Sequence, residues 1–231
     1  MGRLRPQVVV LDVNETLSDL EPLRAAFQTV GLPGHQLETW FSSTLRDGFA
    51  LTAAGTCPAF ADVASDVLRQ LLHTSAGATT GAEDAVGQVL GSFMELDVHP
   101  DVRPGLELLH DAGIRLVTLT NGSTRVAKGL FERAGMIDLV EQFMSVEEAG
   151  RWKPAPEAYR FAANECGVEP ERMALVAVHP WDIDGAVRVG MTGGWVNRRR
   201  RPYPEVMLPP HEDGDDLVDL ARSLLTLPSA E

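Results

Sequence analysis

The sequence predicts an α/β fold in which a parallel sheet carries an inserted all-helical domain, and three observations support this. Short apolar runs occur at 8–11, 114–119 and 174–178, and segments with helical spacing separate the later runs. The long stretch 20–95 shows helical spacing only. Apolar strands that alternate with helices indicate a parallel sheet covered on both faces and joined by right-handed crossovers. The expected architecture is a Rossmann-like core with a helical cap.

The first half of the chain supplies one strand and then the insertion. Apolar residues recur there at three- and four-residue intervals, as on the buried face of a helix. They are Leu37, Trp40, Phe41, Leu45 and Phe49, followed by Val63, Val67, Leu68, Leu71 and Leu72. Clusters rich in Gly and Thr at 52–56 and 75–81 interrupt the pattern. We expect the cap to span 18–96 and the core to comprise 1–17 and 97–231.

The second half alternates helix and strand, with Gly or Pro at the expected boundaries. The expected elements are a helix from Pro104 to Gly113, a strand at 114–119, a helix at 123–133, a strand at 142–144, a helix at 156–166, a strand at 174–178, a helix at 182–189 and a strand at 194–196. These strands complete the sheet that 8–11 begins.

Composition is that of an ordinary globular protein. The 231 residues are 44% hydrophobic and 23% charged, and no apolar run is long enough to cross a membrane. The apolar stretch behind the basic N-terminus is too short for a signal peptide, so we expect a cytoplasmic location. Cys57 and Cys166 are too few for a disulfide framework and have no partners at metal-ligand spacing, which predicts buried or idle thiols.

The formal net charge of −13 argues against nucleic acid as a partner, because phosphate binding needs a basic face. A small anionic substrate would need local cations, and Lys153 and Arg46 are the candidates. The basic run 198–201 could steer anionic substrates, but we favour a solvated loop that pairs with the acidic stretch 212–216 and assign the run no function.

Asp12 ends the first apolar run and opens the string Asp-Val-Asn-Glu-Thr-Leu. A carboxylate at the end of a buried strand can serve as a nucleophile at the carboxyl edge of an open sheet, although a turn former is the commoner role. Three further stretches, 116–123, 151–154 and 175–182, follow apolar runs or precede helices. In this order and spacing the four stretches resemble the motifs of the haloacid dehalogenase superfamily.

Asn14 distinguishes the branches of that superfamily. The usual first motif is Asp-x-Asp-x-Thr, whose second Asp protonates the leaving group, and general acid catalysis is worth ~10²–10⁴ in rate. Asn14 cannot supply that proton, which disfavours a phosphatase, whereas a halide leaves without one. The chain is most similar to the type II L-2-haloacid dehalogenases, which commonly read Asp-x-Tyr-Gly-Thr-Leu. Asn14 and Glu15 therefore change the shape of the pocket.

The resemblance implies a set of catalytic roles. Asp12 is the nucleophile and Lys153 keeps it ionised. In the last motif, which in the family reads roughly Ser-x-Asn-x-Trp-Asp, Asp182 orients Lys153 or helps to activate water. His179, which replaces the amide of that motif, could share the base role or simply be a hydrogen-bonded structural residue. Thr16 orients Asp12 or holds the substrate carboxylate.

The resemblance also implies residues that bind the substrate or the halide. Thr120 and the amides near Gly122 would hold a carboxylate, although a helix N-cap selects the same residue types. Asn121 and Arg46 would receive the halide, while an exposed helix arginine is the competing interpretation of Arg46. The remaining expected pocket residues are Val13, Asn14, Tyr159 and Trp181.

These expectations describe a hydrolase that converts small 2-haloalkanoic acids to 2-hydroxy acids through an aspartyl ester. We expect no cofactor and no metal, because few carboxylates remain to bind Mg²⁺. Two alternatives stay open, a weak phosphatase that uses the same Asp12 and a ligand-binding homologue without catalysis. Because the family is often dimeric, the resemblance also suggests a homodimer.

Overall fold

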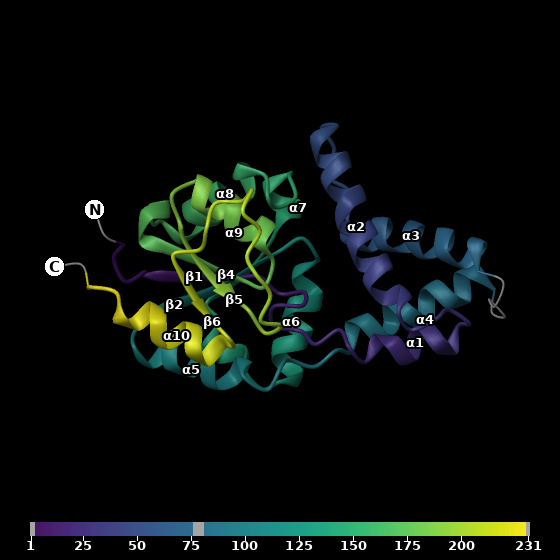
Figure 1. The fold of residues 1–231 in the computed structure, drawn as a ribbon, viewed down its shortest axis with the longest axis horizontal. Coiled ribbons are helices and arrows are strands. Elements are labelled where there is room, and N and C mark those ends of the chain that lie inside the picture. Colours follow the sequence, from purple (N-terminus) through teal and green to yellow (C-terminus); the bar gives the residue numbers. More distant parts are fainter. Residues whose placement is uncertain (1–2, 76–80, 230–231) are drawn as a thin grey trace.

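A computed structural model describes residues 3–75 and 81–229. Its centre is a parallel sheet of six strands in the order β3-β2-β1-β4-β5-β6 (Figure 1). The strands are β1 (Val8–Leu11), β2 (Arg115–Thr120), β3 (Gln142–Ser145), β4 (Met173–Ala177), β5 (Thr192–Val196) and β6 (Glu212–Gly214). The Rossmann-like core predicted from the sequence is confirmed.

β1 lies in the middle of the sheet, and its four residues are completely buried. Successive side chains of a strand point to opposite faces, so Val8 and Val10 pack into one apolar cluster and Val9 and Leu11 into another. The first cluster includes α8 (Pro156–Cys166) and α9 (Pro180–Arg188). The second includes α5 (Val102–Asp111), α6 (Thr124–Arg133) and α10 (Leu217–Thr226). Helices thus cover both faces of the sheet.

Between β1 and α5, the residues that the structure describes form four helices, which stand beside the sheet (Figure 1). They are α1 (Leu23–Thr29), α2 (Gln36–Ala53), α3 (Phe60–Thr74) and α4 (Ala82–Met94). Trp40 is fully buried among them and packs edge-on against Phe27 and Phe93. The inserted all-helical cap is therefore confirmed as an architecture.

Two backbone hydrogen bonds join the chain that enters the cap to the chain that leaves it. The amide of Asp19 donates to the carbonyl of Asp97, and the amide of His99 donates to the carbonyl of Leu17, both at 2.9 Å. They lie close to the predicted boundaries at 17/18 and 96/97, which stay a prediction.

Differences from the sequence-based prediction are concentrated near the C-terminus. β6 consists of Glu212, Asp213 and Gly214, has no apolar pattern, and forms only because the edge of β5 is available for pairing. α10 was also missed, although Asp216 caps it by accepting a hydrogen bond from the amide of Asp219. The remaining short elements are α7 (Val146–Ala149) and the 3₁₀ turns Ile137–Leu139 and Pro170–Arg172.

The cap docks on the core through Trp152, which is fully buried. Its indole nitrogen donates to the carbonyl of Pro58 at 2.9 Å, and its ring stacks on Phe60 with centroids 5.8 Å apart. Gly48 of α2 lies against the same ring, where a Cβ atom would come within 2.1 Å of it. The closeness of cap and core at this point requires glycine.

We predict that Gly48→Ala destabilises the protein by about 1–3 kcal/mol, the usual cost of overpacking a filled site. Gly87→Ala in α4 is the matched control, because nothing lies within 4 Å of its added Cβ, and it should stabilise the helix by about 0.5–1 kcal/mol. Urea denaturation measures both free energies of unfolding. Equal effects of the two substitutions would contradict the proposed contact.

Candidate active site

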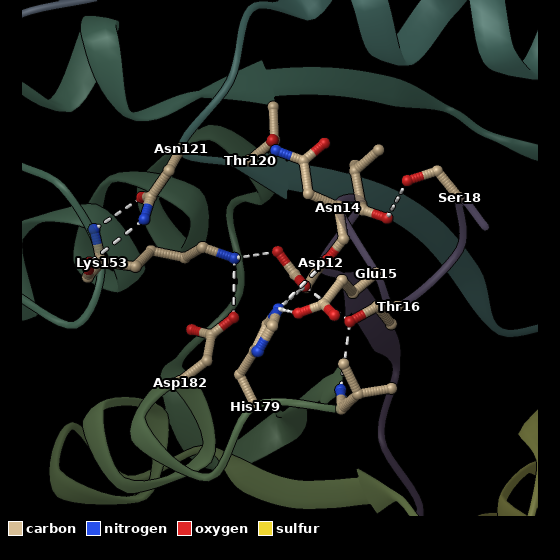
Figure 2. A network of polar contacts seen from close by, with 12 residues as sticks. Asp12, Asn14, Glu15, Thr16, Ser18, Thr120, Asn121, Lys153, His179 and Asp182 are labelled. Carbon is tan, nitrogen blue, oxygen red and sulfur yellow. Dashed lines mark hydrogen bonds and ion pairs between the residues drawn. The ribbon is translucent and has the colours of Figure 1, made fainter. Parts of the chain in front are cut away.

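Asp12 follows β1 directly and is almost completely buried. Its amide donates to the carbonyl of Val176 in β4, which extends the strand pairing by one residue. Its Oδ2 accepts a hydrogen bond of 2.6 Å from the hydroxyl of Thr16, and that hydroxyl accepts one from the amide of Val178 at 3.1 Å (Figure 2). Thr16 therefore orients the carboxylate.

Lys153 reaches the same carboxylate from the loop before α8. Its ammonium donates to Asp12 Oδ1 at 2.8 Å, to Asp182 Oδ2 at 2.7 Å and to the carbonyl of Leu119 at 2.8 Å. The side chain is wholly inaccessible to solvent. All three N–H donors of the ammonium are thus paired, as a buried charge requires.

The three buried charged groups shift one another's pKa values. Burial alone would raise the pKa of Asp12, but Lys153, followed by His179, outweighs it and holds that pKa below its usual value. For Lys153, burial is opposed more strongly by the two carboxylates, so its pKa is raised. Burial and the negative charge of Asp12 leave the pKa of Asp182 raised in spite of Lys153. Asp12 is consequently an ionised carboxylate that is almost completely buried.

Asp182 has no free oxygen. Its Oδ2 is bound by Lys153, and its Oδ1 accepts a hydrogen bond of 2.6 Å from the hydroxyl of Tyr159. Burial and then the charge of Asp182 raise the pKa of Tyr159 well above its usual value, so the hydroxyl remains a donor. Tyr159 thus positions Asp182, and Asp182 positions Lys153.

The stretch after β2 positions Lys153 as well. The side chain of Asn121 pairs with the backbone of Lys153, accepting from its amide at 2.9 Å and donating to its carbonyl at 3.3 Å. The hydroxyl of Thr120 accepts from the amide of Gly122 at 2.9 Å. Asn121 therefore holds the backbone of Lys153 in place, and its predicted halide role stays a prediction.

His179 lies on the other side of Asp12. Its Nε2 is 3.7 Å from Asp12 Oδ2, 3.8 Å from Glu15 Oε2 and 3.1 Å from the carbonyl oxygen of Asn14. All three neighbours are acceptors, so Nε2 carries a proton in this arrangement. Trp181 stacks on the ring with centroids 4.9 Å apart. Trp181 thus contacts His179 rather than Asp12.

Glu15 is a site residue that the sequence analysis noted only as a change of pocket shape. Its φ of 62° is left-handed, a region that favours glycine, and glycine is what the related motif has at this position. A side chain at such a position carries backbone strain of order 1–3 kcal/mol and is often functional. The presence of Glu15 where the related motif has glycine was the signal in the sequence that could have identified this site residue.

Two predicted pocket residues lie outside the network. Arg46 points to solvent, with 66% of its side chain exposed, and pairs with the neighbouring Asp47 at 2.7 Å. Phe41 of α2 faces the site instead, and its ring stacks on the imidazole of His179 with ring centroids 6.1 Å apart. Val13 is buried in the apolar cluster below the sheet edge. Five residues further along the helix than Phe41, Arg46 points to a different face, and its predicted halide role stays a prediction.

A cavity of about 730 Å³ opens beside this network, at the carboxyl ends of β1, β4 and β5. His179 and Glu15 line it, together with Phe41 and Leu45 of the cap. Ligands of open α/β sheets bind at this kind of edge, where the strand order changes direction. Water and small solutes therefore reach the network from the side of His179 and Glu15.

The acidic side chains do not fit a Mg²⁺ ion. The ammonium of Lys153 already lies between Asp12 and Asp182, where it supplies the positive charge that a metal would bring. Asp184 is paired with Arg188 at 2.7 Å. Among residues 3–75 and 81–229, no group of three or more His, Cys, Asp or Glu side chains could hold a metal ion.

A family model for haloacid dehalogenase-like hydrolases matches residues 6–190, which include every residue of this network. The chain belongs to that family. The same range takes in the cap as well as most of the sheet, so the two-part architecture is part of the match.

Relatives of this haloacid dehalogenase-like hydrolase include dehalogenases and a phosphatase. (S)-2-haloacid dehalogenase 1 of Pseudomonas sp. (strain CBS-3) is 29% identical over 62% of this chain and 63% of its own length. Enolase-phosphatase E1 of Nocardia farcinica is 28% identical over 93% of this chain and 97% of its own. A crystal structure of an L-2-haloacid dehalogenase superposes with a TM-score of 0.86 and 26% identity, covering 97% of this chain and 100% of the other.

The first four curated relatives, which are all dehalogenases by name, are matched over only 53% to 63% of their own length. In the part of this hydrolase that the structure describes, no helix is both long and apolar enough to span a membrane. Cys57 and Cys166 are free thiols, and only Cys166 is buried.

We predict that Lys153→Met destabilises this hydrolase by about 3–5 kcal/mol, because it leaves two buried carboxylates without their cation. The double variant Lys153→Met/Asp182→Asn should recover part of that loss by removing one of the charges. Denaturant unfolding measures both, with Lys128→Met on the exposed side of α6 as control. A double variant less stable than the single one would contradict the electrostatic account.

Proposed function

We propose that this hydrolase removes halide from small 2-haloalkanoic acids and produces 2-hydroxy acids through an ester on Asp12. The observation that carries the proposal is a buried Asp12 carboxylate held ionised by Lys153, with the amide of Asn14 where a phosphatase needs an acid. A halide leaves as a stable anion, so this arrangement suits it and disfavours leaving groups that require a proton.

In the first step an oxygen of Asp12 attacks C2 of the substrate from the side opposite the halogen. The oxygen–carbon bond forms as the carbon–halogen bond breaks, and the halide leaves with the bonding electrons, so C2 is inverted. Thr16 and Lys153 hold the carboxylate in a fixed orientation during the attack.

In the second step water attacks the carboxyl carbon of Asp12 and the ester bond to that carbon breaks. The water's proton passes to the carboxylate of Glu15, because Nε2 of His179 already carries a proton, and it returns to the oxygen of the departing 2-hydroxy acid. Glu15 and His179 border the cavity, whereas both oxygens of Asp182 are engaged and inaccessible. We therefore assign water activation to Glu15 with His179, and the orientation of Lys153 to Asp182.

Chloride release from the two enantiomers of 2-chloropropionate tests the proposal. We expect one enantiomer to be turned over, Asp12→Asn to reduce the rate to background, and a chelator to leave the rate unchanged, because Lys153 takes the place of a metal. A matched assay follows phosphate release from phosphate esters with Mg²⁺.

Mg²⁺-dependent phosphate release that exceeds chloride release would favour the phosphatase alternative, which the similarity to the enolase-phosphatase supports. Ligand binding that survives Asp12→Asn, with no turnover of either class by the unaltered protein, would favour a non-catalytic homologue.

We predict that His179→Asn, which restores the amide of the related motif, lowers the hydrolysis rate of the ester by about 10²–10⁴. The ester then accumulates, and mass spectrometry of the peptide that contains Asp12 should detect it. Glu15→Gln should act in the same direction, because it removes the carboxylate beside the imidazole. His73→Asn, at an exposed position of α3, is the control. Slower turnover with no trapped ester would place His179 in the first step instead.

A cytoplasmic location and a homodimer also belong to this proposal. Cell fractionation and the sedimentation of the purified protein measure these two properties directly.

A further inference from the structure

The cavity beside His179 is larger than a short haloacid requires. Its volume of about 730 Å³ lies in the range of ~300–1,000 Å³ that accommodates drug-sized ligands. Leu37, Phe41 and Leu45, spaced four residues apart on one face of α2, form an apolar wall, and Trp195 of β5 also lines the space. A substrate chain longer than that of a propionate can therefore be accommodated.

The loop after β5 forms another part of the wall and is held in one conformation. The side chain of Asn197 donates to the carbonyl of Arg201 at 3.0 Å and accepts from its amide at 2.9 Å. Between them Arg200 has a left-handed φ of 48°, which closes the turn. The hydroxyl of Tyr203 donates to the carbonyl of Pro180, next to His179, at 3.1 Å. The loop is thus fixed to the site.

The turn directs the side chains of neighbouring arginines to different sides. Arg199 and Arg201 line the cavity, whereas Arg200 does not and instead pairs with Asp215 at 2.6 Å. Arg199 lies 3.6 Å from the carboxylate of Glu15. The guanidinium of Arg201 makes no hydrogen bond or ion pair with any residue in 3–75 or 81–229. Two further arginines of the cavity are already neutralised, since Arg24 pairs with Glu21 and Glu38 and Arg198 pairs with Asp101 at 3.0 Å.

We propose that Arg199 and Arg201 form a subsite for a second, distal carboxylate, so that the preferred substrates are 2-halo dicarboxylic acids. The reacting end lies at Asp12, the aliphatic middle lies along the apolar wall, and the far carboxylate binds the two guanidinium groups. This inference rests on the proposed dehalogenation and specifies its substrate class.

The positions of the charges support this orientation. Three successive contacts connect Arg199 to Asp12: Arg199 to Glu15 at 3.6 Å, Glu15 to His179 at 3.8 Å, and His179 to Asp12 at 3.7 Å. The distal carboxylate therefore binds close to, yet separate from, the reacting atoms. Arginine suits the task, because its planar fork matches a carboxylate and keeps its charge at every working pH.

The test compares 2-bromoadipate with 2-bromohexanoate, which have the same chain length and differ only in a carboxylate or a methyl group at the far end. We expect a higher kcat/KM for 2-bromoadipate. Arg201→Gln should reduce the ratio of the two kcat/KM values by about 10–100-fold, the usual worth of a hydrogen bond to a charged group. Arg201→Lys should retain part of the preference, and Arg200→Gln should leave the ratio unchanged.

The subsite would be overturned if Arg201→Gln and Arg200→Gln had the same ratio of kcat/KM for 2-bromoadipate to kcat/KM for 2-bromohexanoate. A preference of the unaltered protein for 2-bromohexanoate would overturn it as well. Calorimetric binding of adipate and hexanoate, which have no halogen to lose, separates this proposal from the catalytic one. Adipate that binds more tightly, with a dependence on Arg201, would support the subsite even if no compound released halide. Halide release without any preference for the dicarboxylate would leave the catalytic proposal standing and remove the subsite.

Discussion

The ammonium of Lys153 between the carboxylates of Asp12 and Asp182 is the interaction on which the site depends. A buried cation is stable only when its charge and all its donors are compensated, so each partner must be held in place. Those partners come from the end of β1, the end of β2 through the carbonyl of Leu119, and α9. The parallel register of neighbouring strands brings these ends together at one edge. The same compensation keeps Asp12 ionised although it is almost completely buried.

The residue before this lysine attaches the cap to the core. Trp152 is buried against Gly48 and Phe60 of the cap. Its backbone amide donates a hydrogen bond of 3.3 Å to the hydroxyl of Thr52, which also belongs to the cap. Docking of the cap and placement of the cation therefore share one short stretch of backbone. Asn121 fixes this stretch from the other side through two hydrogen bonds to Lys153. The docking of the cap and the orientation of the Asp12 carboxylate are physically connected in this way.

The two sides of Asp12 differ in their exposure to the cavity. On the side of Lys153, Asp182 and Tyr159 are fully buried and satisfy each other. On the other side, His179 and Glu15 border the cavity, and the aromatic rings of Phe41 and Trp181 stack on the imidazole. The side of Lys153 holds the buried charges, and the side of His179 and Glu15 borders the cavity.

The sequence by itself determined the α/β class, the inserted helical cap, all strands except β6, and the positions of Asp12, Lys153 and Asp182. Apolar periodicity and motif spacing are local properties that a single chain displays directly. Only the tertiary structure decided that Phe41 and not Arg46 faces the site, that Asn121 holds the backbone of Lys153, and that Glu15 joins His179. These facts depend on the rotation of a helix about its axis, on partners more than thirty residues away, and on one left-handed backbone angle. Each is settled by packing between distant segments, which no local pattern records.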